Sequence, residues 1–440
     1  MLQDTIVAIA TPLQEGAISI IRVSGDEAIS IVSSVLDKDL SKQKRNTIVY
    51  GHVMQNAEAI DEVLVSVFRN PHSFTREDVV EVNCHGGVYI TRKILALILS
   101  KGARLAMPGE FTRRAFLNGR IDLTQAEAIN DMILADSESS SKLAIQGIKG
   151  SVKQLLDPLI EDMLEVIANI EVNIDYPEYD DVVQLTSTLV LPKIEDWLTQ
   201  INAILKKAES GRIMKNGVKT VIIGKPNVGK SSLFNALLEE NKAIVTDIAG
   251  TTRDLVEGTI RLENVTLHLI DTAGLHDTKD IVEKIGIQKT QEALEEAELV
   301  ILLLDSTREM DAEEKELKQL TEQKNGIVVW NKDDEGKETE LAISAIQNRI
   351  QPLIDEINHR YEYHKMHIDE AVLNNERQIS LVFQAKEALL QAKQAVSMEM
   401  ELDLVTIDIQ QAYQCLKEIL GEVSRDDLLD ALFENFCLGK

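Results

Sequence analysis

The sequence predicts a multidomain protein in which an α/β domain with a phosphate-binding loop is inserted into an α-helical domain, after an α+β domain at the N-terminus. Residues 224–231 match the loop pattern G-x-x-x-x-G-K-[ST] between a short apolar strand and a helix. Short β-branched segments precede residue 119, whereas helical spacing dominates residues 119–212 and returns after Asn375. We expect the two helical segments to pack together as one discontinuous domain.

The composition is that of a globular protein of 440 residues, enough for about two to four domains. The sequence has no apolar run long enough to span a membrane, and we expect no secretion signal because the first residues lack a basic n-region and a cleavage pattern. The cysteines Cys84, Cys415 and Cys437 are odd in number and widely spaced, which argues against a disulfide framework or a zinc site. We therefore expect a cytoplasmic protein in a reducing compartment.

The formal net charge is −27. A protein that binds nucleic acid usually carries a basic face to neutralise phosphates. We therefore expect RNA to be bound only through a local basic patch or together with a basic partner. The same charge should repel anionic membranes.

Residues 1–118 are predicted to form the α+β domain. Strands are expected over residues 16–23, 62–68 and 78–82, and a helix is expected over residues 88–99. Cys84 stands in Cys-His-Gly-Gly, where we interpret it as a small buried residue before a turn rather than as a nucleophile.

The helical domain is predicted in two parts, residues 119–212 and 366–440. Residues 124–127, Thr-Gln-Ala-Glu, predict a capping box at the first helix. Long helices should then extend to about Gly211, with a break at residues 175–177 because proline cannot continue a helix.

Residues 213–365 are predicted to form the inserted domain. Residues 299–304 and 327–330 are short and apolar, as expected of strands buried on both faces of a parallel sheet. In the loop before them, Lys230 can reach the β and γ phosphates of a nucleotide, and the Ser231 hydroxyl can bind Mg²⁺.

Downstream motifs indicate a Ras-like GTPase domain. Residues 271–274, Asp-Thr-Ala-Gly, follow an apolar strand, and Asp271 can order Mg²⁺. Residues 331–334 fit N-K-x-D, in which Asp334 accepts hydrogen bonds from guanine N1–H and N2–H₂. Each motif alone could be a turn, a cap or a polar loop, but their order makes coincidence improbable. The predicted GTP-binding residues are Asn227, Val228, Gly229, Lys230, Ser231, Ser232, Thr246, Asp247, Ile248, Ala249, Gly250, Thr251, Thr252, Asp271, Thr272, Ala273, Gly274, Asn331, Lys332, Asp334, Ser344, Ala345 and Ile346.

One position departs from the Ras-like pattern. Leu275 stands where Ras-like proteins have the glutamine that orients the attacking water. An apolar side chain cannot do this, so another group must. The downstream carboxylates Asp277, Asp280 and Glu283 are candidates, and the residues alone do not choose among them.

The whole chain resembles the MnmE (TrmE) family of tRNA modification GTPases. The resemblance is carried by residues 4–8, 21–25, 84–87 and 108–111, and by the C-terminal Phe-Cys-Leu-Gly-Lys at 436–440, which generic GTPases lack. It implies that Glu283 orients the attacking water and that K⁺ stands where other enzymes place an arginine finger. The implied K⁺ ligands are Asn227, Thr246, Ile248 and Thr251, and the implied Mg²⁺ ligands are Ser231 and Thr252.

The resemblance also implies that the N-terminal domain forms a homodimer and binds a 5-formyl- or methylene-tetrahydrofolate. Arg22, Glu81, Arg120 and Lys440 match the family's folate contacts, with Arg120 where relatives often have lysine. Cys437 is a candidate catalytic thiol near that site. Without the family, Cys437 simply ends an amphipathic helix.

The implied function is modification of the wobble uridine of tRNA, by 5-carboxymethylaminomethyl addition, together with a flavin-dependent partner of the MnmG (GidA) type. The alternative is a ribosome-assembly GTPase of the Era or Der kind. That function would need an RNA-binding domain, such as a KH Gly-x-x-Gly loop on a basic face, which we do not find. A dynamin-like membrane GTPase is disfavoured by the negative charge.

Overall fold

The computed structural model describes residues 4–135, 137–175, 187–240, 256–270, 297–334, 341–366 and 371–422, together with positions 432, 433, 436 and 439. The chain forms two compact units. The first comprises Met1–Ala135, Ala144–Thr199 and Ser380–Lys440, and the second comprises Asp136–Leu143 and Gln200–Ile379. The predicted multidomain fold class is confirmed, whereas the boundaries of the four predicted segments stay predictions.

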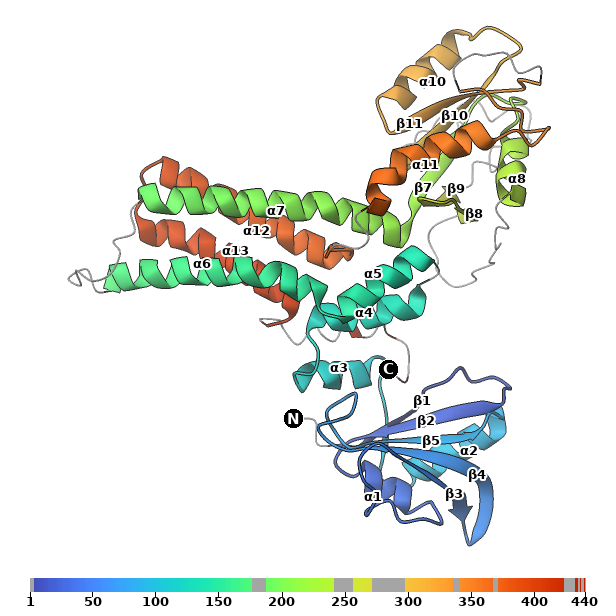
Figure 1. Ribbon diagram of the computed structural model, residues 1–440, viewed down its shortest axis with the longest axis vertical. Helices are drawn as coiled ribbons and strands as arrows, with labels where there is room; N and C mark the ends of the chain where they lie inside the picture. Colours follow the sequence, from blue (N-terminus) through green and yellow to red (C-terminus); the bar gives the residue numbers. More distant parts are fainter. Residues whose placement is uncertain are drawn as a thin grey trace, which may run out of the picture. The chain divides into compact units, whose positions relative to one another are not determined.

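A six-stranded sheet of order β3-β4-β5-β2-β1-β6 forms the N-terminal part of the first unit (Figure 1). Neighbouring strands are antiparallel, except for the parallel pair β1 and β6. The three predicted strands are confirmed as β2, β4 and β5, within a few residues at each end. The strands are β1 (Ile6–Ile9), β2 (Ile18–Ser24), β3 (Thr47–Gln55), β4 (Glu58–Phe68), β5 (Val79–His85) and β6 (Arg104–Leu105).

Helices α1 (Ala28–Ser33) and α2 (Val88–Leu99) cover one face of this sheet, and α2 has the predicted bounds. Alternate strand residues such as Val23 and Val82 form a core with Ile94 of α2, because successive side chains of a strand point to opposite faces. Arg22 of β2 and Glu81 of β5, two of the candidate folate residues, therefore lie on the opposite face.

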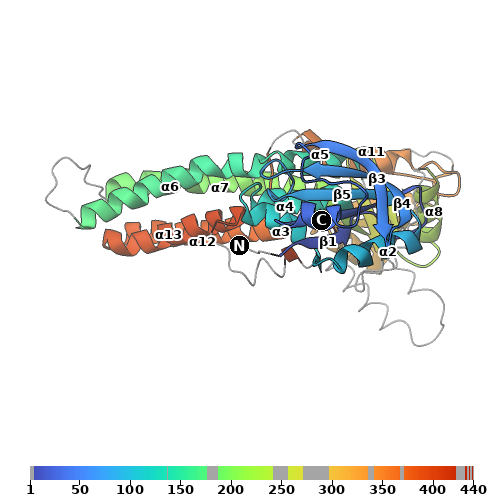
Figure 2. The ribbon, with the colours of Figure 1, turned by 90° about the horizontal axis from the view of Figure 1, so that it is seen from below.

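In the helical part of the chain, the long helices α6, α7, α12 and α13 run side by side (Figures 1 and 2). Gln410 Nε2 donates to Glu171 Oε1 at 3.0 Å between α13 and α6, and Lys393 pairs with Glu195 at 2.8 Å between α12 and α7. The two helical segments therefore pack together as predicted. The helices are α3 (Glu110–Leu117), α4 (Leu123–Leu134), α5 (Glu138–Ile148), α6 (Ser151–Asp175), α7 (Ser187–Asn216), α12 (Glu376–Ser397) and α13 (Leu402–Leu420).

The capping box predicted at residues 124–127 is wrong by two positions. Asp122 is the N-cap of α4: its Oδ1 accepts from the backbone N–H of Gln125, and the Gln125 side chain accepts from the N–H of Asp122. Thr124 is already helical, and its hydroxyl donates to Asp122 Oδ1. A carboxylate is a better acceptor for helix N–H groups than a hydroxyl, so Asp122 takes the cap.

The predicted helix end at Gly211 is also wrong, because α7 continues to Asn216. The glycine serves close packing rather than termination: a Cβ there would lie 2.6 Å from the carbonyl oxygen of Leu373. Two residues later, Ile213 joins the core of the second unit. The last turns of α7 thus lead directly into the α/β sheet of that unit.

A five-stranded sheet of order β11-β10-β7-β9-β8 forms the centre of the second unit. Its strands are parallel except β8, which is antiparallel to β9. The elements are β7 (Val218–Ile223), α8 (Lys230–Glu240), β8 (Val256–Arg261), β9 (Thr266–Ile270), β10 (Leu299–Asp305), α10 (Ala312–Glu322), β11 (Gly326–Asn331) and α11 (Gln351–Met366).

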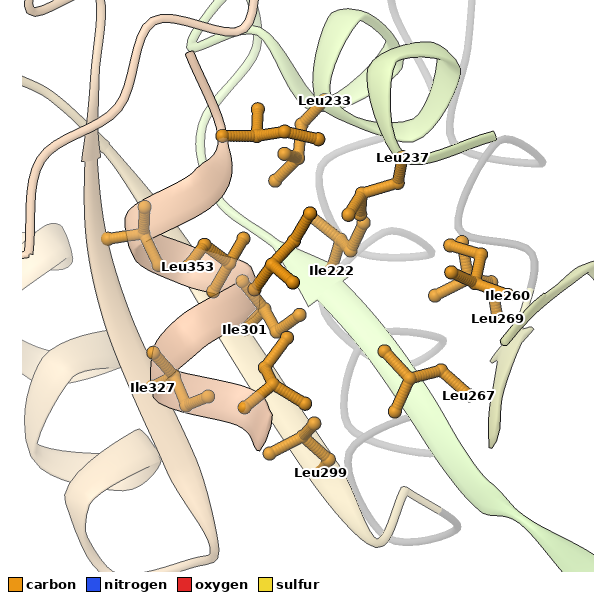
Figure 3. Close-up of a cluster of buried hydrophobic side chains, with 14 of the residues drawn as sticks. Ile222, Leu233, Leu237, Ile260, Leu267, Leu269, Leu299, Ile301, Ile327 and Leu353 are labelled. Carbon is orange, nitrogen blue, oxygen red and sulfur yellow. The ribbon is translucent and has the colours of Figure 1, made fainter. Parts of the chain in front are cut away.

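Strand β10 is buried along its whole length, as predicted for a strand covered on both faces. Ile301 points into a core with Leu233 of α8 and Leu353 of α11 (Figure 3), whereas Leu302 belongs to the core under α10. Because the carboxyl ends of parallel strands meet at one edge, the segments after β7, β10 and β11 converge there. Among the described residues, no helix is long and apolar enough to cross a membrane.

Candidate functional site

The phosphate-binding loop connects β7 to α8, the context that the sequence predicts. Asn227 has a φ of 64° and Gly229 a φ of 102°, both in the left-handed region. A side chain at Gly229 would collide with the side-chain nitrogen of Asn331, so glycine is required there. The loop backbone can therefore turn its N–H groups inward to cradle a phosphate.

Lys230 is folded into this loop. Its ammonium donates to the carbonyl oxygens of Gly224 at 2.7 Å and of Lys225 at 3.0 Å. Burial lowers the pKa of Lys230, because the protein removes water from the ammonium. A phosphate beside it would favour the charged form, so the position suits an anionic ligand.

Asn331 joins the phosphate loop to the segment that is predicted to contact the base. Its Nδ2 donates to the Val228 carbonyl at 2.8 Å, and its Oδ1 accepts from the Ala345 N–H at 3.0 Å. The side chain is buried, so both bonds are shielded from water. Three predicted nucleotide residues from distant parts of the sequence are thus connected through one amide.

The predicted base-recognition residue Asp334 accepts a hydrogen bond from the Ser344 hydroxyl at 2.5 Å. This contact brings together the two predicted base segments, residues 331–334 and 344–346. The Ser344 hydroxyl orients the carboxylate of Asp334, whose remaining lone pairs are acceptors for the N–H groups of a guanine.

Lys332, the second residue of the N-K-x-D motif, forms an ion pair within the structure. Its ammonium lies 2.7 Å from Asp305 Oδ2 at the end of β10. Burial alone would raise the pKa of Asp305, but hydrogen bonds from Lys332 and Thr307 lower it to about 2. Sequence reasoning missed Asp305, although an acidic residue directly after an apolar strand is a usable signal.

A second unexpected contact concerns Lys225 of the loop. Its ammonium lies 2.5 Å from Asp311 and 2.7 Å from Glu313, at the N-terminus of α10. Asp311 also caps α10 through the N–H of Glu314. The phosphate loop is thus linked by ion pairs to α10, and no sequence motif indicated this.

Several predicted residues lie outside the described residues, and their placement stays a prediction. This concerns Thr246, Asp247, Ile248, Ala249, Gly250, Thr251, Thr252, Asp271, Thr272, Ala273, Gly274, Glu283, Cys437 and Lys440, and also the water-orienting candidates Asp277 and Asp280 and the position of Leu275. Val228, Ser231, Ser232 and Ile346 are described and lie in the phosphate loop, at the start of α8 and in the turn after Ser344.

In the first unit, the structure brings two predicted folate residues together. Arg22 of β2 and Glu81 of β5 are paired in the sheet register, and the Arg22 Nε donates to Glu81 Oε1 at 2.8 Å. Both side chains are about one-fifth exposed, so the pair is partly shielded. The Arg22 guanidinium also lies 5.7 Å from the centre of the Phe111 ring.

The C-terminal tail reaches the same place. The Arg22 Nη1 donates to the carbonyl oxygen of Gly439 at 3.1 Å. Gly439 has a φ of 92°, and a Cβ there would lie 2.5 Å from the carbonyl of Ile9. Phe433 and Phe436, which precede Gly439 by a few residues in the sequence, are buried beside Leu123 and Ala126 of α4. Gly439 of the tail therefore lies beside the Arg22–Glu81 pair.

Arg120 approaches the same group of side chains from another segment. Its guanidinium lies 4.7 Å from the centre of the Phe74 ring and donates to the Phe74 carbonyl at 3.3 Å. Phe74 packs in one cluster with Phe111, over which Arg22 lies. Burial lowers the pKa of Arg120, with a smaller contribution from Arg76. The two aromatic residues that connect Arg22 and Arg120 were not predicted as site residues.

Cys84 is buried, as its interpretation as a structural residue requires. Burial raises the pKa of its thiol, which disfavours the thiolate that a nucleophile needs. A separate hollow of about 610 Å³ lies beyond it at the start of α2, between Glu15, Gly87 and Arg92. That hollow contains none of the predicted folate residues.

Comparison with known proteins covers the whole chain. The family described as "GTP-binding protein TrmE N-terminus" matches residues 5–120, and "MnmE helical domain" matches residues 123–437. A tRNA modification GTPase MnmE of Streptococcus thermophilus (strain CNRZ 1066) is 46% identical over 449 residues, which cover 99% of this chain and 98% of that protein. The MnmE of Lactococcus lactis subsp. cremoris (strain SK11) is 46% identical over 448 residues, with the same coverage.

Among solved structures, the G domain of the FeoB iron transporter of T. maritima is 29% identical and matches 33% of this chain and 98% of that chain, with a TM-score of 0.24. The likeness to the two MnmE proteins extends through both units, from the N-terminal sheet to the C-terminal helices. The chain therefore belongs to the MnmE (TrmE) family of tRNA modification GTPases.

Proposed function

We propose that this chain is a K⁺-dependent GTPase that modifies the wobble uridine of tRNA by 5-carboxymethylaminomethyl addition, with a flavoprotein partner of the MnmG (GidA) type and a one-carbon unit from tetrahydrofolate. The observation that carries the proposal is the presence of two sites in one chain. One site joins a phosphate loop to a base-recognition loop through Asn331, and the other gathers Arg22, Glu81 and the tail at Gly439.

The GTP site is proposed to work as follows. Asp334 accepts the N1–H and N2–H₂ donors of guanine, and Asn331 holds the base loop at a fixed distance from the phosphate loop. Lys230 places its charge against the β and γ phosphates, where negative charge develops during hydrolysis. The hydroxyls of Ser231 and Thr252 are suitable ligands for Mg²⁺, a hard cation that prefers oxygen.

Hydrolysis is proposed to need two further groups, because Leu275 cannot orient water. Glu283 takes this role as a carboxylate acceptor. K⁺, held by the oxygens of Asn227, Thr246, Ile248 and Thr251, would supply positive charge beside the phosphates. The left-handed backbone of Asn227 in the described loop is compatible with a specialised role of this residue.

The N-terminal site is proposed to bind the folate. The Glu81 carboxylate is an acceptor for the N–H groups of the pterin ring of the folate. Cations for the carboxylates of the folate's glutamate part are Arg22, Arg120 and Lys440. Cys437 stands two residues before Gly439, whose carbonyl contacts Arg22. We propose Cys437 as the candidate thiol of the one-carbon chemistry.

The assembly is proposed to be a cytoplasmic homodimer through the N-terminal domain, with G domains of two subunits meeting across their nucleotides. Its segments are residues 1–118 for folate binding and dimerisation, 119–212 and 366–440 for the helical domain, and 213–365 for the GTPase. Because the net charge is −27, the flavoprotein would supply basic surface for the tRNA.

The function is tested by mass spectrometry of tRNA nucleosides from cells that lack the chain. Loss of the 5-carboxymethylaminomethyl group from wobble uridine, restored by the full-length chain, is the expected result. Unchanged nucleosides, with a defect in ribosomal subunits instead, would favour a ribosome-assembly GTPase. A chain truncated before Cys437 should fail to restore the modification, and full restoration would remove the tail from the proposal.

The potassium requirement is tested on the purified chain. GTP hydrolysis should be faster in KCl than in NaCl at equal ionic strength, and the Glu283→Ala variant should bind GTP normally but hydrolyse it slowly. A rate that is the same in both salts contradicts the potassium site, and normal turnover of the variant contradicts the role of Glu283.

A further inference from the structure

The loop that connects α1 to β3 (Figure 1) is unusually basic for this chain. Lys42, Lys44 and Arg45 stand within four residues, and no other window of four residues in the sequence contains three lysines or arginines. The sequence has no aspartate or glutamate over residues 40–57. Because the net charge of the chain is −27, such a cluster needs a physical explanation. We refer to residues 37–46 as the basic loop.

The negative charge of the chain is unevenly distributed. Residues 1–118 contain 13 lysines and arginines and 13 aspartates and glutamates, so this segment has no formal net charge. The net charge of −27 therefore falls entirely on residues 119–440. A polyanion that approaches the chain is thus repelled least by the N-terminal segment, which contains the basic loop.

The backbone of the basic loop is held by contacts on its inner side. Arg69 Nη2 donates to the Ser41 carbonyl at 2.7 Å, and Arg69 Nε donates to the Gln43 carbonyl at 3.1 Å. Leu40 is fully buried in the core beneath the N-terminal sheet. The loop is therefore an ordered part of the domain, and its cations start from fixed backbone positions.

The cations of the basic loop are available to a ligand. Four of them are exposed, namely Lys38, Lys42, Lys44 and Arg45. None of these four forms an ion pair with another described residue, whereas the two carboxylates of the loop are engaged elsewhere. Asp37 lies 3.0 Å from His52 Nδ1, and Asp39 accepts from the N–H of Ser41 at 2.8 Å. Four positive charges thus stand against two carboxylates, and the loop has a net positive charge.

The register of the N-terminal sheet places the end of the basic loop level with the candidate folate site. Thr47, the first residue of β3, is connected to Val23 of β2 through directly paired residues of β4 and β5. Arg22 precedes Val23 in the sequence. Strands β3 and β2 are three positions apart in the sheet, so the distance between them is roughly 14 Å. One folded RNA can therefore contact the loop and also reach the candidate folate site.

We infer that the basic loop binds the phosphate backbone of tRNA and holds the RNA beside the candidate folate site. The inference rests on the proposed function for the identity of the RNA. An acidic protein surface is the alternative ligand, but the only apolar residue of the loop, Leu40, is buried, so the loop lacks the apolar centre of a protein interface. Lysine ammonium groups neutralise phosphates without reading bases. The loop should therefore contribute a similar factor to the affinity for every tRNA.

The test measures the affinity of the purified full-length chain for unmodified tRNA transcripts by fluorescence anisotropy at several KCl concentrations. The triple variant Lys42→Ala/Lys44→Ala/Arg45→Ala should weaken binding by about 10-fold or more at moderate salt. The slope of log affinity against log salt should flatten by about one for each phosphate contact that is lost. The double variant Lys42→Arg/Lys44→Arg keeps the charge and should retain the affinity.

A second triple variant, Arg92→Ala/Lys93→Ala/Lys101→Ala, is the matched control. It removes the same charge from the same domain, on α2 and just after it. This control should change the affinity for tRNA by less than about twofold, because α2 covers the other face of the sheet. Helical content and GTP hydrolysis of both triple variants should equal those of the wild type, which excludes a folding defect.

The inference is overturned by equal tRNA binding of the wild type and the loop variant, by equal losses in the loop and control variants, or by no tRNA binding of the wild-type chain. A loop variant that binds tRNA normally but self-associates differently in sedimentation also overturns it, in favour of a protein interface. None of these results overturns the proposed function, which fails instead if tRNA nucleosides are unchanged in cells that lack the chain.

Discussion

The nucleotide site and the N-terminal candidate folate site are built in different ways. In the nucleotide site, the phosphate loop and the N-K-x-D segment directly follow the parallel strands β7 and β11, and these segments meet because the strand ends meet. In the N-terminal site, Arg22 and Glu81 face each other across two antiparallel strands, although 59 residues separate them in sequence. The carbonyl that completes this group, that of Gly439, is 417 residues away from Arg22.

This difference explains why one site has a recognisable motif and the other does not. The phosphate loop uses backbone N–H groups, which require particular dihedral angles and therefore glycines at fixed spacing. The N-terminal site uses side chains on regular strands, where any residue adopts the same backbone. Its specificity lies in the strand register and in the position of the tail, and neither leaves a local pattern in the sequence.

Because the two sites are built from different elements, we expect a change in one to leave ligand binding at the other unaltered. The variant Lys230→Ala tests this expectation and should have the largest effect. Loss of the ammonium removes charge stabilisation at the phosphates, so GTP hydrolysis should fall by about 10²- to 10³-fold. Phosphate release measures the rate, and fluorescence titration measures folate binding. A parallel loss of folate affinity would show that the two sites are coupled and would contradict their expected independence.

Asp334→Asn should have the next largest effect. The amide cannot accept both guanine donors, so GTP affinity should fall by about 10²-fold. An amide N–H can instead donate to the C2 carbonyl of xanthine, so xanthosine triphosphate should bind better than GTP. Competition between the two nucleotides measures the change. Retained preference for GTP would place base recognition elsewhere, and Asp333→Asn serves as the neighbouring control.

Arg22→Ala should reduce tetrahydrofolate affinity by about 10- to 100-fold, since it removes a charged donor and leaves the partly buried Glu81 without its cation. GTP hydrolysis without the partner should be unchanged. Lys93→Ala, which removes a half-buried cation of α2 in the same domain, is the control. Isothermal titration with 5-formyl-tetrahydrofolate gives both affinities, and equal values for the two variants would exclude Arg22 from the folate site.

The sequence was sufficient for the elements that local periodicity encodes. The buried strand β10, the helix α2 and the context of the phosphate loop were predicted from alternation, helical spacing and glycines. The cap of α4 was misplaced because Thr124 and Asp122 both satisfy the local rule, and only the hydrogen bonds decide between them. Gly211 was misread as a helix end because close packing against Leu373 is a tertiary cause.

In the candidate sites too, local motifs were predicted from the sequence, whereas contacts that depend on tertiary structure were not. Asn331 was identified by its motif, but its double role between Val228 and Ala345 depends on how two loops fold together. The Lys225–Asp311 pair joins loops that are unrelated in sequence, so no pattern could indicate it. Arg22 and Glu81 were identified only by family resemblance, because a single charged residue on a strand is indistinguishable from a surface ion.

The smallest expected effect concerns the proton on Lys230. Burial lowers its pKa from the ordinary 10.5 in the chain without nucleotide. Between pH values equal to that lowered pKa and 10.5, Lys230 binds fewer protons in the folded chain than in the unfolded chain. In this pH window, the contribution of Lys230 to the free energy of unfolding therefore rises with pH. Phosphates raise the pKa again, so GTP binding should take up less than one proton in the same window and none at lower pH. Affinity should accordingly fall as the pH rises through it.

Calorimetry in two buffers of different ionisation enthalpy, at neutral and at alkaline pH, measures this uptake. Lys230→Arg is the control, because a guanidinium stays charged throughout and should abolish the uptake even if affinity falls. Arginines 22 and 120, the described cations of the folate site, stay charged throughout, so they should give folate binding no matching proton uptake in this window. Uptake of equal size at both sites would contradict the assignment to Lys230 and would place the titrating group in a part that the two sites share.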